Sequence, residues 1–346
     1  MNRSLFFIIV AVFVFILPQQ ASASWYDMTW GYRKSHVVNG AAGAGTNYQV
    51  MITTYYGSGT DSAGSVYLSS HSKTDFGDIR FTASDGITLL NYWMASKVDS
   101  NNAVFWVKIP DNISASPSTI YIYYGMASAT TTSNGANTFL FFDDFSGDLS
   151  KWTVESSSGV YPRIESGYMR AGGGTTGGGY GFTSLGSSPT YSTFADAAVG
   201  GKVYNSLDAI GEVAFRGVAA GNTGYKGRSD ARAGQGQSFQ APPYSSWNFL
   251  PGGGCGADGV APPINTWGTF EIQTTGTTFR YYRDGTLQRT CTDVTYAGPG
   301  EIALQNHYGS YTDYDDIYVR KFVSPEPGHG AWGIEELPSR RKILYY

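Results

Sequence analysis

The chain has 346 residues, which is enough for two domains of ordinary size, and only 14% of them are charged, with a formal net charge of −4. Because there is no basic surplus, the composition argues against nucleic acid and against an anionic membrane surface as partners. The 45 Gly residues and the aromatic content of 15% favour short strands that are joined by Gly-rich turns.

Residues 1–23 have the features of an export signal. Arg3 gives a positive start, the residues from Leu5 to Leu17 are all apolar, and Ala23 and the small residues just before it match the usual cleavage pattern. The alternative is a membrane anchor, but the apolar run is shorter than the roughly 20 residues that span a bilayer. We therefore expect cleavage after Ala23 and a secreted or cell-surface protein without a membrane span after cleavage.

Residues 24–137 show the alternation of apolar and polar residues that predicts β-strands. Phe105, Val107 and Ile109, for example, would share one face of a strand. The strands predicted in this region are residues 48–56, 65–70, 78–83, 103–110 and 119–125. We interpret residues 24–137 as one β domain.

Residues 127–138 are rich in Ser, Thr, Ala and Asn, and the domain boundary is placed there. Beyond it, Gly-rich loops alternate with short strands, and Asp284-Gly285 is a hairpin-turn signal. The strands predicted in this half are residues 269–275, 278–283, 287–292, 301–307 and 315–323. Many short strands without intervening helices predict an all-β fold with two antiparallel, jelly-roll-like β-sandwich domains. The second spans residues 138–324, and residues 325–346 are expected to be a loose tail.

The chain has two cysteines, Cys255 and Cys291. An exported protein meets an oxidising environment, which favours a Cys255–Cys291 disulfide that ties a Gly-rich loop to a strand of the second domain. The alternative is a nucleophilic cysteine, which needs a partnering His, and no local pattern supplies one.

Five blocks in the first half occur in an order that is typical of one protein family. They are Trp30-Gly31-Tyr32-Arg33, Asp78-Ile79-Arg80-Phe81-Thr82, Leu89-Leu90-Asn91-Tyr92-Trp93, Phe105-Trp106-Val107-Lys108-Ile109-Pro110 and Ile120-Tyr121-Ile122-Tyr123-Tyr124-Gly125. On these blocks, residues 25–137 resemble the family known as domain of unknown function 2341. The family recurs in secreted and cell-surface proteins of bacteria and archaea, often beside sugar-binding sandwich modules, and the resemblance implies no activity of its own.

The second half resembles a concanavalin A-like lectin or glucanase sandwich over residues 139–323. The motifs that carry this resemblance are Phe142-Asp143-Asp144-Phe145, Lys151-Trp152, the hairpin from Phe279 to Gly285 and Asp315-Asp316-Ile317-Tyr318-Val319-Arg320. The resemblance implies a carbohydrate-related role for this half.

Glycosidases on this sandwich carry closely spaced carboxylates on one strand, as in Glu-x-Asp-x-x-Glu, because alternation then aims them into one cleft. No such spacing occurs here, since Glu271 and Glu212 each stand alone on their strands. We therefore predict no catalytic residues and no enzymatic activity. Carboxylates assembled from distant strands are the open alternative.

The acid pairs Asp143-Asp144 and Asp315-Asp316 are the candidate metal ligands. They lie near the first and last strands of the proposed sandwich, and in the modules that it resembles a structural Ca²⁺ can sit between those strands. Clustered carboxylates suit a hard cation. The alternative is that these residues cap turns or are solvated.

Sugar binding needs flat aromatic faces and planar polar groups. The predicted ligand-binding residues are Trp247, Tyr244, Tyr308, Asn306 and Arg228, with Tyr225, Tyr311 and Arg232 as further candidates. Trp30, Trp93, Trp106 and Trp152 are expected to be core residues.

The first hypothesis for the function is a non-catalytic, glycan-binding or adhesive protein whose partner is a glycan or a cell-surface polysaccharide. Other surface proteins are further partners to consider. The alternatives are a structural subunit of an extracellular assembly and a polysaccharide-degrading enzyme.

Overall fold

The structure is a computed structural model that describes residues 23–156, 162–172, 181–185, 195–217, 224–241, 250, 254–308 and 311–338. The predicted export signal lies outside these residues, except for Ala23. Within them, no helix is long and apolar enough to cross a membrane.

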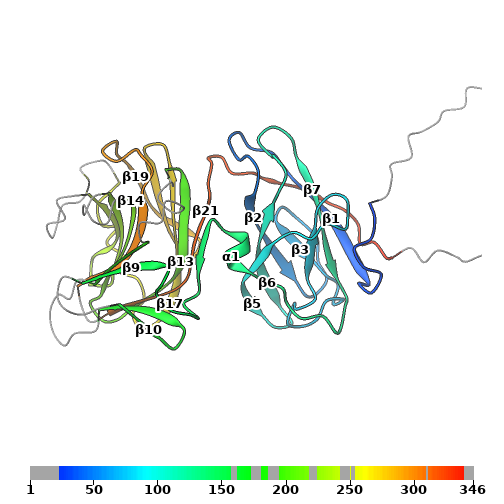
Figure 1. Ribbon diagram of the computed structural model, residues 1–346, viewed down its shortest axis with the longest axis horizontal. Coiled ribbons are helices and arrows are strands. Elements are labelled where there is room, and N and C mark those ends of the chain that lie inside the picture. The colour runs from blue at the N-terminus through cyan, green and yellow to red at the C-terminus, as the bar shows by residue number, and fades with distance from the viewer. Residues whose placement is uncertain are drawn as a thin grey trace, which may run out of the picture.

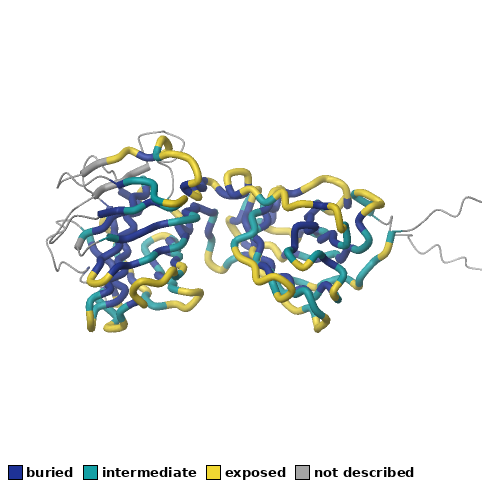
Figure 2. Tube along the Cα trace, turned by 90° about the horizontal axis from the view of Figure 1, so that it is seen from below, coloured by how far each residue is buried: buried dark blue, intermediate teal, exposed yellow. Residues whose placement is uncertain are grey.

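The described strands form two β-sandwiches that lie side by side along the longest axis of the molecule (Figure 1). Buried residues fill the interior of each sandwich, and exposed residues follow the loops (Figure 2). The predicted all-β class with two largely antiparallel sandwiches is confirmed.

The first sandwich has two sheets of four described strands each. One sheet has the order β22-β1-β7-β4, and its strands are β1 (Tyr32–Val38), β4 (Arg80–Thr82), β7 (Ser118–Tyr124) and β22 (His329–Trp332). The other has the order β3-β2-β6-β5, and its strands are β2 (Tyr48–Tyr55), β3 (Ser65–Tyr67), β5 (Tyr92–Val98) and β6 (Asn102–Ile109). Of these pairs, only β2 with β3 is parallel. Phe105, Val107 and Ile109 point into the core together, as the alternation predicts, and pack with Ile120 and Ile122 of β7.

The second sandwich pairs a sheet of eight described strands with a sheet of six. The larger sheet has the order β10-β11-β21-β13-β17-β18-β19, with β8 paired to β21; its strands are β8 (Phe141–Asp143), β10 (Arg163–Glu165), β11 (Tyr168–Gly172), β13 (Ala197–Asn205), β17 (Trp267–Thr275), β18 (Thr278–Arg283), β19 (Thr286–Thr292) and β21 (Tyr311–Lys321). The smaller sheet has the order β16-β15-β14-β20-β12-β9; its strands are β9 (Trp152–Ser156), β12 (Gly181–Leu185), β14 (Ile210–Gly217), β15 (Tyr225–Asp230), β16 (Gly236–Gln240) and β20 (Glu301–Tyr308).

The predicted disulfide is confirmed. Cys255 and Cys291 are bonded at an S–S distance of 1.99 Å, and both are fully buried in the core of the second sandwich. The bond ties the loop beyond β16 to β19, so that this loop is held against the edge of the larger sheet.

Residues 325–338, the described part of the C-terminal segment, do not form the loose tail that we expected for residues 325–346. After β21 the chain returns to the first sandwich, where β22 pairs with β1 and places Trp332 opposite His36. Farther along, Glu336 contacts the buried Arg33 through an ion pair of 2.7 Å. The expectation was wrong because β22 is a four-residue edge strand that contains a glycine, too short for alternation to identify.

His36 joins β1 to this returning strand. Its Nε2 atom lies 2.9 Å from Nδ1 of His329, and its ring stacks on Trp332 with centroids 3.9 Å apart. Burial, assisted by the neighbouring His329, lowers the pKa of His36 to about 3. The folded protein therefore keeps His36 neutral at a pH where the unfolded chain protonates it.

We expect the free energy of unfolding to decrease as the pH falls below about 6.5, because the unfolded state then binds a proton that folded His36 does not. One such group contributes about 1.4 kcal/mol for each pH unit between about 6.5 and 3. Urea unfolding at several pH values in this window measures the slope. The His36→Gln variant should give a shallower slope, and equal slopes in the two proteins would contradict the assignment.

An aromatic cluster closes one side of the contact between the sandwiches. Phe139, Phe142 and Tyr318 pack there against Trp93 and Trp106, next to the short helix α1 (Gly135–Thr138). We expected both tryptophans to be core residues, whereas they lie on the outer side of their sheet. Tyr92, Phe105 and Val107, which are next to them in sequence, point into the core, so alternation directs the two tryptophans outward. Trp30 and Trp152 are buried as expected, and only Trp152 belongs to a main sandwich core.

Candidate functional site

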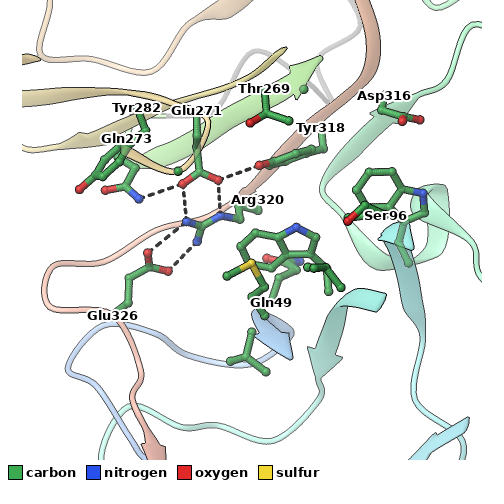
Figure 3. Close-up of a pocket in the computed structure, with 18 of the residues that line it drawn as sticks. Gln49, Ser96, Thr269, Glu271, Gln273, Tyr282, Asp316, Tyr318, Arg320 and Glu326 are labelled. Carbon is green, nitrogen blue, oxygen red and sulfur yellow. Dashed lines mark hydrogen bonds and ion pairs between the residues drawn. The ribbon is translucent and has the colours of Figure 1, made fainter. Parts of the chain in front are cut away.

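A cleft of about 530 Å³ lies between the outer faces of two sheets, one from each sandwich. The first sandwich contributes Trp93 and Trp106. The second contributes Glu271, Tyr318 and Arg320 (Figure 3). Glu326, on the segment that returns to the first sandwich, forms part of the same wall (Figure 3). Polar side chains and aromatic rings share this lining, so the chemistry of the cleft depends on whether its polar groups are available.

Arg320 uses its full hydrogen-bonding capacity inside the protein. Nε and Nη2 donate to the two carboxylate oxygens of Glu271 at 3.0 and 2.7 Å. Nη1 and Nη2 donate to those of Glu326 at 2.6 and 3.0 Å, and Nη1 also donates to the carbonyl of Lys321 at 3.2 Å. A guanidinium has five N–H donors, so no donor of Arg320 remains for a ligand.

The carboxylate of Glu271 also uses its full hydrogen-bonding capacity inside the protein. Besides the two bonds from Arg320, it accepts one hydrogen bond from Gln273 and one from the Tyr318 hydroxyl, both at 2.8 Å. Burial raises the pKa of Glu271, but the charge and hydrogen bonds of Arg320 outweigh this effect and hold the pKa below its usual value. A carboxylate that stays ionised and saturated is unsuited to act as a general acid.

These contacts make the polar wall of the cleft a lock between the sandwiches. Tyr48 of β2 donates to Glu326 at 2.9 Å. Gln49, its neighbour, donates to the carbonyl of Thr138 and accepts from the backbone N–H of Lys321. The arrangement therefore fixes the relative position of the two sandwiches and commits these groups to contacts within the protein.

A second group of polar residues lies on the side of the smaller sheet that faces away from the core. Val213 of β14 and Tyr225 of β15 point into the core, so alternation directs their neighbours to the opposite side. This Glu212 face comprises Glu212 of β14, Lys226, Arg228 and Asp230 of β15, Ser238 and Gln240 of β16, and Gln305 and His307 of β20. Glu212, Arg228 and Gln240 are 1%, 2% and 4% exposed, which is unusual for polar residues outside a core.

Glu212 lies at the centre of this face among three basic side chains. Its carboxylate is 3.3 Å from Nζ of Lys226, 3.5 Å from Nε of Arg228 and 3.8 Å from Nδ1 of His307. Among the described residues, neither oxygen of Glu212 has a hydrogen-bond partner, and the same holds for Nε of Arg228 and Nε2 of Gln240. Buried polar groups are normally satisfied, so a cluster of unsatisfied ones calls for a bound molecule or water.

Asp230, at the end of the same face, does have hydrogen-bond partners. Arg232 donates to it from Nε and Nη2 at 2.9 and 2.7 Å, and Arg228 donates from Nη2 at 3.3 Å. These bonds hold the planar guanidinium of Arg228 in place while its Nε remains directed at Glu212. The face thus offers a fixed acceptor and fixed donors side by side.

The structure places the predicted ligand-binding residues in different surroundings. Arg228 belongs to the Glu212 face, although on a strand and not on a loop. Asn306 is also on a strand, β20, but it is fully buried on the core side, since it alternates in phase with Ile302 and Leu304. Tyr225 is likewise a core residue. Tyr244 and Trp247 lie outside the described residues, as does the side chain of Tyr308.

The segments that carry the two acid pairs are neighbours, because β8 pairs with β21 and brings Asp143 opposite Ile317. Asp143, however, is buried and accepts hydrogen bonds from Lys151 and from the indole of Trp152. Asp315 and Asp316 both pair with Lys202, and Asp144 caps the turn at Ser146. In the described part of the chain, no three His, Cys, Asp or Glu residues group in a way that could hold a metal ion.

Of the residues on the Glu212 face, only Arg228 was predicted from the sequence to bind a ligand. One usable signal was present in Lys226-Gly227-Arg228-Ser229-Asp230, where charged residues alternate with small ones. On a strand, this spacing directs three charges to one face. Glu212 had no local signal, because its partners come from neighbouring strands.

The chain has structural similarity to several carbohydrate-related proteins. A carbohydrate-binding module, CBM66, from Bacillus subtilis is 12% identical, with a TM-score of 0.35, and the match covers 49% of this chain and 96% of that one. A protein of unknown function with a galectin-like fold from Bacillus subtilis is 12% identical over 53% of this chain and 96% of that one, with a TM-score of 0.40. A β-glucanase from Bacillus licheniformis is 13% identical over 53% and 98%, with a TM-score of 0.36.

No curated protein matches the chain in sequence. The family described as Domain of unknown function (DUF2341) matches residues 75–155. This confirms the resemblance found in the first half, and the match continues past residue 137 through α1 and β8 into β9. Residues 75–155 of the chain are thus a DUF2341-like segment that links the two sandwiches.

Proposed function

We propose that the chain is a carbohydrate-binding protein that holds a saccharide on the Glu212 face without cleaving it. The observation that carries the proposal is the Glu212 carboxylate, which is buried beside Arg228 with both oxygens unsatisfied. A sugar hydroxyl both donates and accepts hydrogen bonds. Neighbouring hydroxyls of one sugar ring can therefore donate to Glu212 while they accept from Nε of Arg228 and from the amide of Gln240.

Two features support binding without hydrolysis. Cleavage of a glycosidic bond requires an acid and a second carboxylate that are both available to the substrate. Asp230, the other carboxylate of the Glu212 face, is held by Arg228 and Arg232. In the cleft, Glu271 and Glu326 are both held by Arg320.

The Glu212→Gln variant tests the proposal. The amide keeps the shape of the carboxylate but loses the charge and half of its acceptor capacity, so we expect saccharide affinity to fall about 10- to 100-fold, as for loss of a charged hydrogen bond. A glycan array followed by titration calorimetry on the ligand it identifies measures this loss, and the thermal midpoint reports whether the variant is folded.

Asp99→Asn is the matched control, because it makes the same chemical change at an exposed carboxylate of the first sandwich. It should bind as the unmodified protein does. Equal affinity of the Glu212→Gln variant would contradict the site, and release of reducing sugar by the purified protein would contradict the non-catalytic role.

A further inference from the structure

Four aromatic side chains gather on the outer face of the larger sheet of the second sandwich. They are Tyr168 of β11, Tyr311 of β21, Tyr204 of β13 and Trp267 of β17, and we call them the aromatic strip. The ring centroids of Tyr168 and Trp267 are 5.6 Å apart, those of Tyr204 and Trp267 5.7 Å, and those of Tyr204 and Tyr311 6.2 Å. The rings of Tyr204 and Tyr311 are parallel to within 3°.

The strip lies outside the core and remains accessible. Neighbouring residues on the same strands, Met169, Val203 and Phe270, point into the core, so the strip residues face outward. Trp267 is 39% exposed, and the three tyrosines are partly exposed. Single exposed apolar residues are common on protein surfaces, but a contiguous aromatic group contributed by four strands is the usual mark of a binding surface.

The strip is held rigid by the residues around it. The guanidinium of Arg170 of β11 lies 3.7 Å from the ring centroid of Tyr311. It is fixed by a bidentate pair with Asp313, in which Nε and Nη2 donate to the two carboxylate oxygens at 2.7 and 2.8 Å. It also donates to the hydroxyl of Tyr168 at 3.2 Å. The Tyr204 hydroxyl donates to Asn265 at 3.3 Å. Rings that are already oriented lose little entropy when a ligand is placed on them.

The border of the strip is polar, and its cations are paired with carboxylates. Arg170 pairs with Asp313 and Glu165, and Lys202 pairs with Asp315 and Asp316. An anionic partner would therefore find neither Arg170 nor Lys202 free to pair with it. Tyrosine and tryptophan faces with a hydrogen-bonding border of this kind suit the apolar C–H faces and the hydroxyls of a neutral sugar chain.

We infer that the aromatic strip is a second carbohydrate-binding surface, which takes a neutral polysaccharide chain laid along the outer face of the larger sheet. It rests on the proposed function only for the class of ligand, since the Glu212 face belongs to the other sheet. Lys202 and Thr269, two positions along β13 and β17 from Tyr204 and Trp267, line the mouth of the cleft. The aromatic strip therefore adjoins the cleft.

Retention in native affinity electrophoresis, in gels that contain a soluble β-1,3-glucan, a xyloglucan or a galactomannan, tests the inference on the full chain. We expect retention by at least one of the three, and a decrease of about tenfold or more in apparent affinity for Trp267→Ala/Tyr204→Ala, as for loss of aromatic contact surface. Trp267→Leu, which stays apolar but loses the flat ring, should lose affinity as well. Retention should persist from about 0.05 to 0.5 M NaCl, because a neutral ligand is insensitive to screening.

The matched control is Tyr55→Ala/Tyr67→Ala, which removes a stacked tyrosine pair of the first sandwich and should leave retention unchanged. The Glu212→Gln variant should also be retained in the polysaccharide gel, although it loses saccharide affinity in calorimetry. Failure of one site is therefore distinguishable from failure of the other. Lack of retention of the unmodified protein in all three gels would overturn the inference. So would full retention of the Trp267 variants, or retention that disappears with salt.

Discussion

The Arg320→Ala variant is expected to lower the free energy of unfolding by about 3–5 kcal/mol, the range found when one partner of a buried ion pair is removed. Arg320 is almost fully buried, and it is the shared partner of Glu271 and Glu326. Its removal leaves Glu271 with a negative charge and no cation. It also breaks the contact of the guanidinium with the Trp106 ring, 4.7 Å away across the cleft. Urea unfolding followed by tryptophan fluorescence measures the loss.

Arg320→Lys distinguishes charge from geometry. A lysine restores the cation but has three donors on one atom, so it cannot bond both carboxylates in the present pattern. We expect a smaller loss than for alanine. Lys97→Ala is the control, since its pair with Asp99 is exposed and is worth about 0–1 kcal/mol. If Arg320→Ala unfolds at the same urea concentration as the unmodified protein, the lock does not stabilise the sandwiches.

A chain that ends at Gly328 is expected to lose several kcal/mol of stability in the first sandwich. This truncation keeps Glu326 in the lock but removes β22 and the residues beyond it. Arg33, which is 2% exposed, then loses its ion pair with Glu336, and the buried Tyr124 hydroxyl loses its acceptor Glu335. An unpaired buried charge alone costs about 3–5 kcal/mol.

Thermal unfolding by circular dichroism and limited proteolysis measure the effect of this truncation. Proteolysis should cut first in residues 24–133 and spare the second sandwich, which keeps its own core and disulfide. A chain that ends at Pro338 is the control, because it retains β22 and both glutamates. If both truncated chains unfold alike, the returning strand does not contribute as we expect.

Local patterns were enough to predict the elements whose residues alternate strictly. β6 is the clearest case, because its buried and half-buried residues alternate along the whole strand. The disulfide was predicted from two cysteines in a chain that has the features of an export signal. By contrast, β1, β5, β22 and the strands from β8 to β16 were not among the predicted strands. In β5 the alternation is obscured because the outer side carries Trp93 and forms an interface instead of a solvated face.

The candidate sites could not be predicted in the same way, because they are assembled across strands. Glu212 meets Arg228 through the pairing of β14 with β15, and His307 through β20. In sequence it stands alone. The same holds for the aromatic strip, where Tyr311 was recognised as a candidate but Trp267 was not, because nothing near Trp267 in sequence indicates that three tyrosines lie beside it.

The return of the chain to β22 has a mechanical consequence. The second sandwich is inserted between β7 and β22 of the first, and Arg33 contacts both the carbonyl of Ala23 and the carboxylate of Glu336, so the two described ends lie together. Tension applied between them would peel β22 from β1, one backbone pair after another. The proposed binding faces of the second sandwich would bear no load until β22 had separated from β1.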